Sequence, residues 1–207
     1  MPRNPYQRAD HRTRQARALG YPARSIFKLE EIDRRVKLLR PGQHVLDLGA
    51  APGSWSMYAA ERVGPHGRIL AIDLRAIDRS LGPNVDVVRG DALDLEQDVL
   101  ARCAPYDVVL SDMAPATSGN RETDHARSAS LFERALRVSE ALTKPGGAFV
   151  AKLFMGDEFE RLRDETRTAF SQVKFIRPQG TRTNSVELFV VGLGRRVAPP
   201  TPTQSRT

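Results

Sequence analysis

Short runs of apolar residues alternate with amphipathic stretches along most of the chain. The apolar runs are rich in β-branched residues and have the length of buried strands. They lie at 44–48, 68–72, 85–89, 107–111, 148–153, 173–176 and 187–191. Apolar residues recur at helical spacing over 54–63, 95–101, 124–142 and 158–170. This alternation predicts an α/β domain with a mostly parallel sheet that is covered by helices on both faces.

The pattern changes near both ends of the chain. Residues 1–20 show no apolar periodicity, and we expect a flexible basic arm there. Ser25 is placed to cap a helix whose apolar positions continue to Val36. No helical pattern occupies 177–186, so a hairpin-like connection would make the final strand antiparallel. The expected organisation is an arm at 1–20, one domain at 21–194, and a polar, proline-rich, disordered tail at 195–207.

Composition narrows the class of protein. A length of 207 residues fits one well-packed α/β domain, and 28% charged residues is ordinary for a soluble protein. No apolar run has the length of a membrane span, and the N-terminus lacks a signal-peptide pattern. The single Cys103 cannot form an intrachain disulfide, and the four histidines lack metal-ligand spacing. We therefore expect a cytoplasmic monomer with no bound metal and no membrane association.

The net charge of +7 is concentrated at the N-terminal end. Residues 1–40 contain eleven basic and four acidic residues, whereas the rest of the chain is neutral. An arginine-rich segment beside a neutral domain suggests contact with a polyanion such as a phosphate backbone, although a solvated leader is the alternative. Tyr6, Tyr21 and Phe27 lie among these arginines and could either stack on bases or pack on the domain.

A glycine-containing loop follows the first predicted strand. It reads Asp47-Leu48-Gly49-Ala50-Ala51-Pro52-Gly53-Ser54-Trp55 and opens a predicted helix. Gly49 and Gly53 allow the backbone to approach a ligand, and ligands of doubly wound sheets bind at this edge. The spacing is not G-x-G-x-x-G, which argues against a nicotinamide dehydrogenase. The alternative is a tight turn in which the glycines have no ligand.

Two acids support a nucleoside-cofactor site at the same edge. Asp73 ends the second strand, where a carboxylate can accept both hydroxyls of a ribose. Asp91 follows the third strand and could meet an adenine amino group or a bound water. The ordinary alternatives are that Asp73 caps a turn and that Trp55 is a buried helix residue rather than a wall of the ligand site.

Four further segments occur with this loop in the order of a known family. They are Arg24–Leu29, Ser111–Pro115, Val150–Phe154 and Ser185–Leu188. Over residues 20–194 the chain resembles the FtsJ/RrmJ (RlmE) family of ribosomal RNA 2′-O-ribose methyltransferases. The resemblance implies a Rossmann-like class I fold that depends on S-adenosylmethionine, with a seven-stranded, mostly parallel sheet and an antiparallel last strand. It also implies an RNA substrate, a uridine in the A-loop of large-subunit (23S) ribosomal RNA, within an assembled or nearly assembled subunit.

The family's catalytic tetrad falls on Lys28, Asp112, Lys152 and Glu187. A ribose hydroxyl is a poor nucleophile, so attack on a sulfonium methyl group needs a base and close positioning. We expect Lys152 to be the base, Lys28 to hold the hydroxyl, and the two carboxylates to orient the lysines. The expected cofactor contacts are Gly49, Pro52, Gly53, Trp55, Asp73, Asp91 and Asp112.

Each tetrad residue also has an ordinary interpretation. Lys28 could face solvent, Asp112 could begin a turn, and Glu187 could lie on an exposed edge strand. Lys152 is less easily dismissed because apolar residues surround it, and a lysine there must be paired or reach solvent. Two positions depart from the family pattern. Ser54 stands where many relatives have glycine, and Ala23 stands where a serine is common.

The polar segment 116–127 follows Asp112 and could close over a substrate, and Arg177 and Arg182 could extend a path for phosphates. Three rival functions remain open. One is 2′-O-methylation of transfer RNA, and another is methylation of an amino group on a base or protein. The third is ribosome assembly without catalysis.

Overall fold

The computed structural model describes residues 5–116, 118–179 and 187–197. Its seven strands form one sheet in the order β3-β2-β1-β4-β5-β7-β6. Every neighbouring pair is parallel except β5–β7 and β6–β7, which are antiparallel. The strands are β1 (His44–Leu48), β2 (Arg68–Asp73), β3 (Val85–Arg89), β4 (Tyr106–Ser111), β5 (Thr143–Phe154), β6 (Phe170–Ile176) and β7 (Glu187–Arg195).

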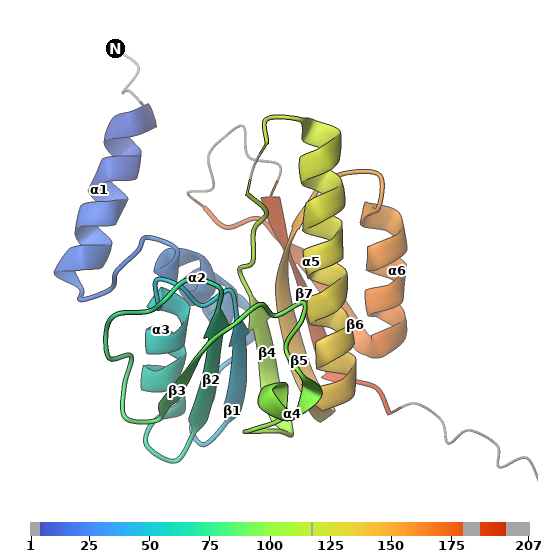
Figure 1. Ribbon diagram of the computed structural model, residues 1–207, viewed down its shortest axis with the longest axis horizontal. Helices are drawn as coiled ribbons and strands as arrows, with labels where there is room; N and C mark the ends of the chain where they lie inside the picture. Colours follow the sequence, from blue (N-terminus) through green and yellow to red (C-terminus); the bar gives the residue numbers. More distant parts are fainter. Residues whose placement is uncertain (1–4, 117, 180–186, 198–207) are drawn as a thin grey trace, which may run out of the picture.

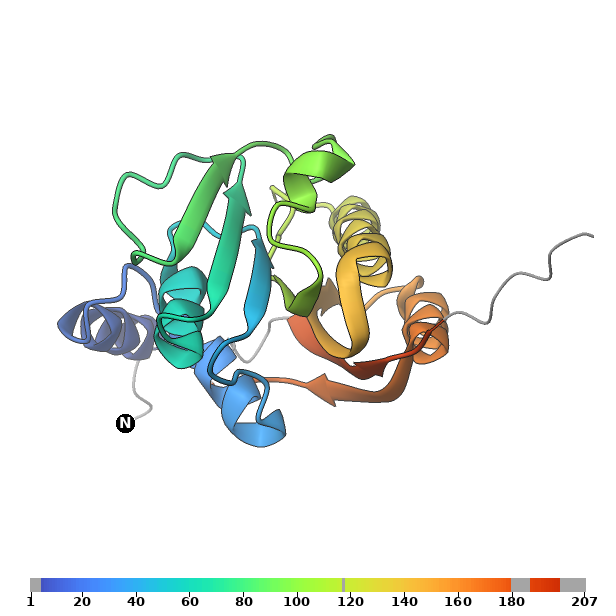
Figure 2. The same ribbon diagram turned by 90° about the horizontal axis from the view of Figure 1, so that it is seen from below.

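Helices cover both faces of this sheet and make a three-layer domain (Figures 1 and 2). On one face, α4, α5 and α6 pack over a core that contains Phe132, Phe149 and Phe170. On the other face, α2 and α3 contribute Leu29 and Trp55 to a second core. The helices are α1 (Pro5–Ala18), α2 (Ile26–Val36), α3 (Ser54–Val63), α4 (Gln97–Leu100), α5 (Arg121–Leu142) and α6 (Phe159–Ala169).

The predicted fold class is confirmed, including the antiparallel last strand. β7 pairs with β5 over seven positions, from Ala148 opposite Leu193 to Phe154 opposite Glu187. Each predicted strand and each predicted helix of the domain is present, with small differences at the ends. The apolar alternation was sufficient for this result because both faces of the central strands are buried, as in other parallel sheets.

Three local features differ from what the sequence led us to expect. A helix, α1, forms within the segment for which we expected a flexible arm, although its turns are so polar that only Ala16 is buried among its described side chains. Helix α5 begins at Arg121, inside the segment expected to be a loop, because the Asn120 side chain caps it by accepting from the Thr123 amide. Ser25 does precede α2, but its side chain makes no capping hydrogen bond.

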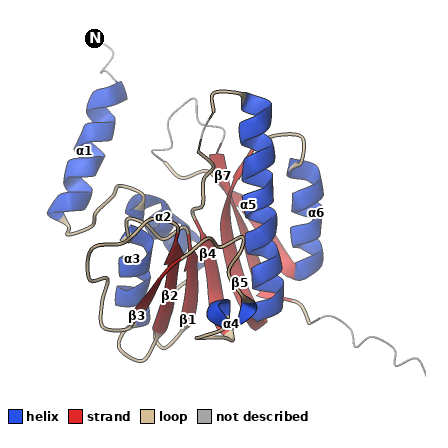
Figure 3. Ribbon diagram, viewed as in Figure 1, coloured by secondary structure: helices blue, strands red, loops and turns tan. Residues whose placement is uncertain are grey.

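Helix α1 lies beside the domain rather than within either layer (Figure 3). Its last turn is connected to the domain through Tyr21, whose amide donates to the Ala16 carbonyl and whose hydroxyl donates to Glu61. Burial and the hydrogen bond to Glu61 raise the pKa of the Tyr21 hydroxyl. Tyr21 therefore packs on the domain, which was one of the two alternatives for the aromatic residues near the N-terminus.

Candidate active site

The candidate residues gather at one edge of the sheet. Parallel strands have their carboxyl ends at the same edge, so the residues that end β1, β2 and β4 lie on that side. Strand β7 runs the opposite way, and its first residue, Glu187, is paired with Phe154 at the end of β5. The order and direction of the strands are thus sufficient to bring residues that are distant in sequence to one edge of the sheet.

The glycine loop is packed against the segment that follows β4. Gly49 has φ +78°, and a Cβ atom at this position would lie 2.8 Å from the Met113 Cγ and 2.9 Å from the Met113 amide nitrogen. Because Met113 directly follows Asp112, this close approach places the glycine loop beside the candidate tetrad. The loop ends at Gly53, which has φ +105° and directly precedes the first turn of α3. A side chain would be strained at both glycines.

Asp47 is a fully buried carboxyl group at this edge. One oxygen, Oδ2, accepts a hydrogen bond of 2.6 Å from the Ser56 hydroxyl. The other, Oδ1, is buried without a hydrogen-bond partner among the described residues. Burial raises the pKa of Asp47 to about 7, and the nearby carboxylates of Asp112 and Asp73 act in the same direction. An unpartnered buried oxygen of this kind points to a group that binds there.

Asp73 organises the turn of the glycine loop. Its Oδ2 accepts from the Ala51 amide at 2.8 Å, and its Oδ1 accepts from the Arg75 amide at 2.8 Å. The turn-capping interpretation is therefore correct. Because Oδ1 also lies 3.5 Å from the Arg75 guanidinium, Oδ2 is the oxygen with a second lone pair left for a ribose hydroxyl. Asp91 likewise accepts from the Leu93 amide at 2.9 Å. The peptide bond between Ala51 and Pro52 in the glycine loop is cis.

Trp55 connects α3 to the start of α2. It is 3% exposed, and its indole nitrogen donates to the Ser25 carbonyl at 2.9 Å. Its ring centroid lies 5.5 Å from that of Phe189 on β7. These contacts favour the packing interpretation of Trp55 over a role as a wall of the ligand site.

The two positions that depart from the family pattern contact each other. The Ser54 hydroxyl accepts from the Ala23 amide at 2.9 Å and donates to the Ala23 carbonyl at 3.1 Å. A glycine at 54 would lack both bonds. The serine therefore adds a direct connection between the cofactor loop and the segment that leads into α2, the helix that carries Lys28.

Lys152 and Asp112 form the first ion pair of the tetrad. The Lys152 amine donates to the Asp112 carboxylate and to the Asp112 carbonyl, both at 2.7 Å. The Lys152 side chain is only 6% exposed, so an unpaired charge there would be costly. Asp112 therefore satisfies a buried amine and fixes its orientation at the end of β5.

Lys28 and Glu187 form the second ion pair. Their side chains are 2.6 Å apart and about four-fifths buried, with exposures of 22% and 17%. The Lys28 amine also lies 5.5 Å from the centroid of the Phe189 ring. Phe189 is the register partner of Lys152, and cross-strand partners lie side by side on one face of a sheet. Phe189 therefore connects the two ion pairs, and all four side chains belong to one cluster.

This cluster and the glycine loop fit a cationic nucleoside cofactor. A Cβ atom at Gly49 would meet Met113 and one at Gly53 would meet Leu81, so both glycines are required by the tight packing of the turn itself. The carboxylates of Asp112 and Asp73 are close enough to Asp47 to raise its pKa, and an acidic wall suits a positive charge. Gly49 and Gly53 would pass along the ligand, Asp73 would hold its ribose, and Asp112 would face its charged centre.

The surroundings of the site differ from expectation in two respects. The loop after β4 is shorter than predicted because α5 begins at Arg121. Asp124 also tethers this loop, since it accepts from the Ser118 amide and hydroxyl at 2.8 and 2.9 Å, and these bonds lower the pKa of Asp124. Arg177 is exposed just after β6, whereas Arg182 lies outside the described residues.

Sequence reasoning missed two residues of this edge. Asp47 was part of the loop motif but was not expected to be an unpartnered acid. Its signal was an acid between two leucines in an apolar strand. Phe189 carried no distinguishing signal, because an aromatic residue in a buried strand is ordinary. Its role becomes visible only when β5 and β7 are paired.

Comparisons with known proteins agree on the class of protein. A model of the family described as FtsJ-like methyltransferase matches residues 21–195. The chain is 62% identical over 197 residues to "Ribosomal RNA large subunit methyltransferase E" of Sorangium cellulosum, covering 95% of this chain and 93% of that protein. It is 50% identical over 190 residues to the protein of the same name from Nitratidesulfovibrio vulgaris, covering 90% and 94%.

A solved structure gives the same result for the fold. A crystal structure assigned as a ribosomal RNA methyltransferase of Plasmodium falciparum superimposes with a TM-score of 0.74 at 25% identity, covering 84% of this chain and 98% of that one. The fold and the site define an S-adenosylmethionine-dependent methyltransferase with a Rossmann-like sheet. The chain belongs to the FtsJ-like methyltransferase family.

Proposed function

We propose that this protein transfers a methyl group from S-adenosylmethionine to the 2′-hydroxyl of a uridine in the A-loop of 23S ribosomal RNA. The observation that carries the proposal is the cluster of two lysine–carboxylate pairs beside the glycine loop. The names of the close relatives support a large-subunit ribosomal RNA as the substrate. The A-loop uridine follows from the family resemblance.

The cofactor would be held mainly by backbone and carboxylates. Gly49, Pro52 and Gly53 would pass along it, Asp73 would accept its ribose hydroxyls, and Asp91 would lie near its base. When bound, S-adenosylmethionine supplies an electrophilic methyl group on a positively charged sulfur. The carboxylate of Asp112 would face this charge while it also holds Lys152. Trp55 would hold the glycine loop in place through the hydrogen bond that its indole nitrogen donates to the Ser25 carbonyl.

Lys152 would remove the proton of the ribose hydroxyl. A neutral amine has two N–H bonds and one lone pair. Asp112 provides two acceptors for the Lys152 nitrogen, so the lone pair of the neutral form is left for the hydroxyl. The bound cofactor would supply the methyl group and would keep the electron pair of the carbon–sulfur bond that breaks as the oxygen–carbon bond forms. The hydroxyl proton goes to Lys152, which requires Asp112 to hold the amine in line.

Lys28 and Glu187 would position the attacking ribose. The Lys28 amine can donate to the ribose oxygen, and its pairing with Glu187 limits its movement. The two pairs therefore have different tasks. The Lys152–Asp112 pair would accept the hydroxyl proton, and the Lys28–Glu187 pair would orient the ribose.

The most direct test of this function is a map of 2′-O-methylated nucleotides in total cellular RNA, with and without the gene. We expect one site in the A-loop of 23S ribosomal RNA to lose its methyl group in the deletion strain. Restoring the wild-type gene should restore it. Loss at a transfer RNA position, or loss of methyl groups on base nitrogens alone, would contradict the proposal. If a Lys152→Ala protein restored ribosome assembly fully, an assembly function without catalysis would be favoured.

A further inference from the structure

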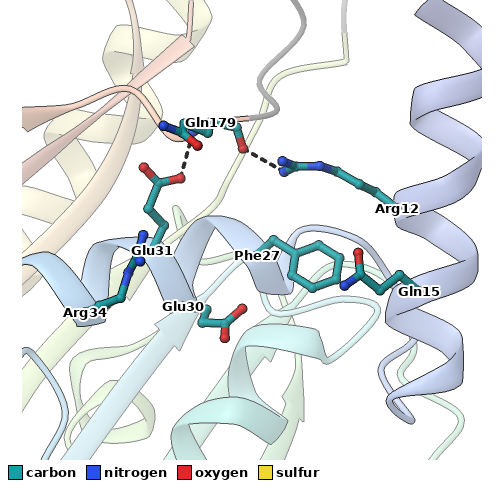
Figure 4. Close-up of a pocket in the computed structure, with 7 residues that line it drawn as sticks. All are labelled: Arg12, Gln15, Phe27, Glu30, Glu31, Arg34 and Gln179. Atoms are coloured by element: carbon teal, nitrogen blue, oxygen red, sulfur yellow. Dashed lines mark hydrogen bonds between the residues drawn. The ribbon is translucent and has the colours of Figure 1, made fainter.

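An opening outside the tetrad lies between α1, α2 and the segment after β6 (Figure 4). Its volume is about 330 Å³, at the lower end of the range of about 300–1,000 Å³ that is typical of small-ligand sites. One wall residue, Phe27, directly precedes Lys28 on α2. The lining residues are Arg12, Gln15, Phe27, Glu30, Glu31, Arg34 and Gln179.

Hydrogen bonds fix one side of this opening. The Arg12 guanidinium donates to the Gln179 carbonyl at 2.6 Å, and the Gln179 amide donates to the Glu31 carboxylate at 2.7 Å. The second oxygen of Glu31 accepts from Arg35 at 2.5 Å. Figure 4 shows Arg12, Gln179 and Glu31 along the upper side of the opening, with Phe27 and Glu30 below. The segment that leads to β7 is thus connected to both α1 and α2.

Two groups of the opening are available to a ligand. Glu30 is exposed, and its carboxylate has no hydrogen bond or ion pair with any described residue. The Phe27 ring has the Arg12 guanidinium 5.9 Å from its centroid. A base between the two groups needs two stacking intervals of about 3.4 Å, or about 7 Å in all. The present separation is 5.9 Å, so Arg12 would need to move away from Phe27 by only about 1 Å for a base to fit between them.

We propose that this opening binds the guanine base of a nucleotide adjacent to the methylated one, an inference that rests on the proposed function. Lys28 and Glu31 are three positions apart on α2, and residues at this spacing are neighbours on a helix surface. Because Glu31 lines the opening together with Phe27, a ribose held at Lys28 places the next nucleotide beside the opening. The base stacks between Phe27 and Arg12, as single-stranded bases do on aromatic and guanidinium planes.

The charges of the opening select a base rather than a phosphate. Arg12 and Arg34 are balanced by Glu30 and Glu31, and a phosphate group would meet both carboxylates. A carboxylate only accepts hydrogen bonds. Guanine presents two adjacent N–H donors on its Watson–Crick edge, the ring imino and the 2-amino group, and both can donate to Glu30. Uracil presents a single imino donor, and adenine presents a single amino group.

Two variants of Phe27 separate stacking from simple packing. Methyl transfer is measured on large ribosomal subunits from a strain that lacks this enzyme. Phe27→Leu keeps apolar volume but removes the ring, and the expected result is a KM for subunits raised about tenfold with kcat unchanged. Phe27→Tyr keeps the ring and should retain the wild-type KM. Equal KM values for Leu and wild type would overturn the proposal.

Glu30→Gln gives opposite results for the two interpretations of that acid. If Glu30 accepts from guanine, the variant raises KM several-fold. If Glu30 is only a surface acid near RNA, removal of its negative charge leaves KM unchanged or lowers it, and the proposal fails. Thermal unfolding of each variant checks the fold. Because Glu30 is exposed and makes no hydrogen bond or ion pair with a described residue, this variant should fold even if Phe27→Leu does not.

Kethoxal footprinting tests the base directly. This reagent adds to the two guanine nitrogens that Glu30 would contact. Wild-type protein should protect a guanine next to the methylated nucleotide, and Glu30→Gln should lose that protection. Absence of protection in the wild-type complex would overturn the guanine site while methyl transfer continues. Absence of methyl transfer by the wild-type protein would instead defeat the proposed function, and this inference with it.

Discussion

At the scale of single residues, Asp47 has the least ordinary environment in the domain. It is fully buried, one of its oxygens has no partner among the described residues, and its pKa is raised by burial to about 7. In the unfolded chain an aspartate loses its proton near pH 4. The native protein therefore holds this proton to a higher pH than the unfolded chain, and the associated stability is lost as the pH rises through about 7.

Asp47→Asn should remove this pH dependence. Asparagine stays neutral, so the free energy of unfolding of the variant relative to wild type should rise between about pH 4 and pH 7. The upper limit of the rise is about 4 kcal/mol, because each pKa unit corresponds to about 1.4 kcal/mol. Urea denaturation from pH 4 to pH 8 measures it. The matched control is Asp78→Asn, an exposed aspartate that should show no such trend. A constant difference at every pH would refute the account.

At the scale of elements, the position of α2 depends on its contacts with the glycine loop. Ser54 exchanges two hydrogen bonds with Ala23, and Trp55 donates to Ser25. These three bonds connect the start of α3 to the residues immediately before α2. Because Lys28 lies in the first turn of α2, the cofactor loop and the lysine that pairs with Glu187 are held as one structural unit.

Ser54→Ala tests this connection. The variant leaves the Ala23 amide without its partner, so we expect a loss of about 1–2 kcal/mol in the free energy of unfolding. Ser130→Ala is the control, since its exposed hydroxyl donates only to the Ala126 carbonyl within α5. It should change stability by less than about 0.5 kcal/mol. Guanidinium denaturation midpoints compare the two. Equal midpoints would mean that the Ser54 bonds contribute nothing.

Some helices and strands could be predicted from the sequence alone, and others could not. The central strands were predictable because their apolar runs are buried on both faces, and β1, β3 and α3 have the predicted limits. Helix α1 was not predictable because its sequence has no apolar stripe and its contacts with the domain are made by polar groups such as Arg12. Strand β5 begins five residues before the predicted start at 148, and these five residues include Pro145 and two glycines, which are unusual within a strand.

The residues of the site could be predicted from the sequence, but the contacts between them could not. The motif order gave the four tetrad residues, and the topology explains why strand ends meet at one edge. The contact of Lys28 with Phe189 could not be predicted, since it depends on the register of β7 against β5. The bond between Ser54 and Ala23 was likewise invisible, because residues 31 positions apart meet only after α2 and α3 pack. Side-chain geometry of this kind follows from tertiary packing, not from local pattern.

Across the whole molecule, the charge distribution separates a basic N-terminal end from a neutral domain. The first 40 residues carry the entire net charge of +7. Helix α1 contains Arg12, Arg14 and Arg17, and Arg12 lines the opening together with Phe27, the residue before Lys28. No helix in the described part of the chain has the length and apolarity of a membrane span. The basic end is thus suited to phosphates near the site.

Neutralising three arginines of α1 should reduce the salt dependence of RNA binding. The triple variant Arg8→Gln, Arg14→Gln and Arg17→Gln keeps Arg12, which bonds to Gln179. Each phosphate contact contributes about 0.7 to the slope of log affinity against log salt, so the slope should become shallower by up to about 2. Filter binding of large-subunit ribosomal RNA at 50–200 mM KCl measures it. Identical slopes for variant and wild type would remove α1 from the RNA-binding surface.

In the proposed mechanism, the buried amine of Lys152, held by Asp112, removes the proton of the attacking hydroxyl. Lys152→Met preserves much of the side-chain volume and removes the amine. The decisive measurement is the single-turnover rate of methyl transfer to large ribosomal subunits, with cofactor affinity determined separately by calorimetry. The account predicts a rate lower by about 10²–10⁴-fold with cofactor affinity changed only a few-fold. A rate within tenfold of wild type would contradict it.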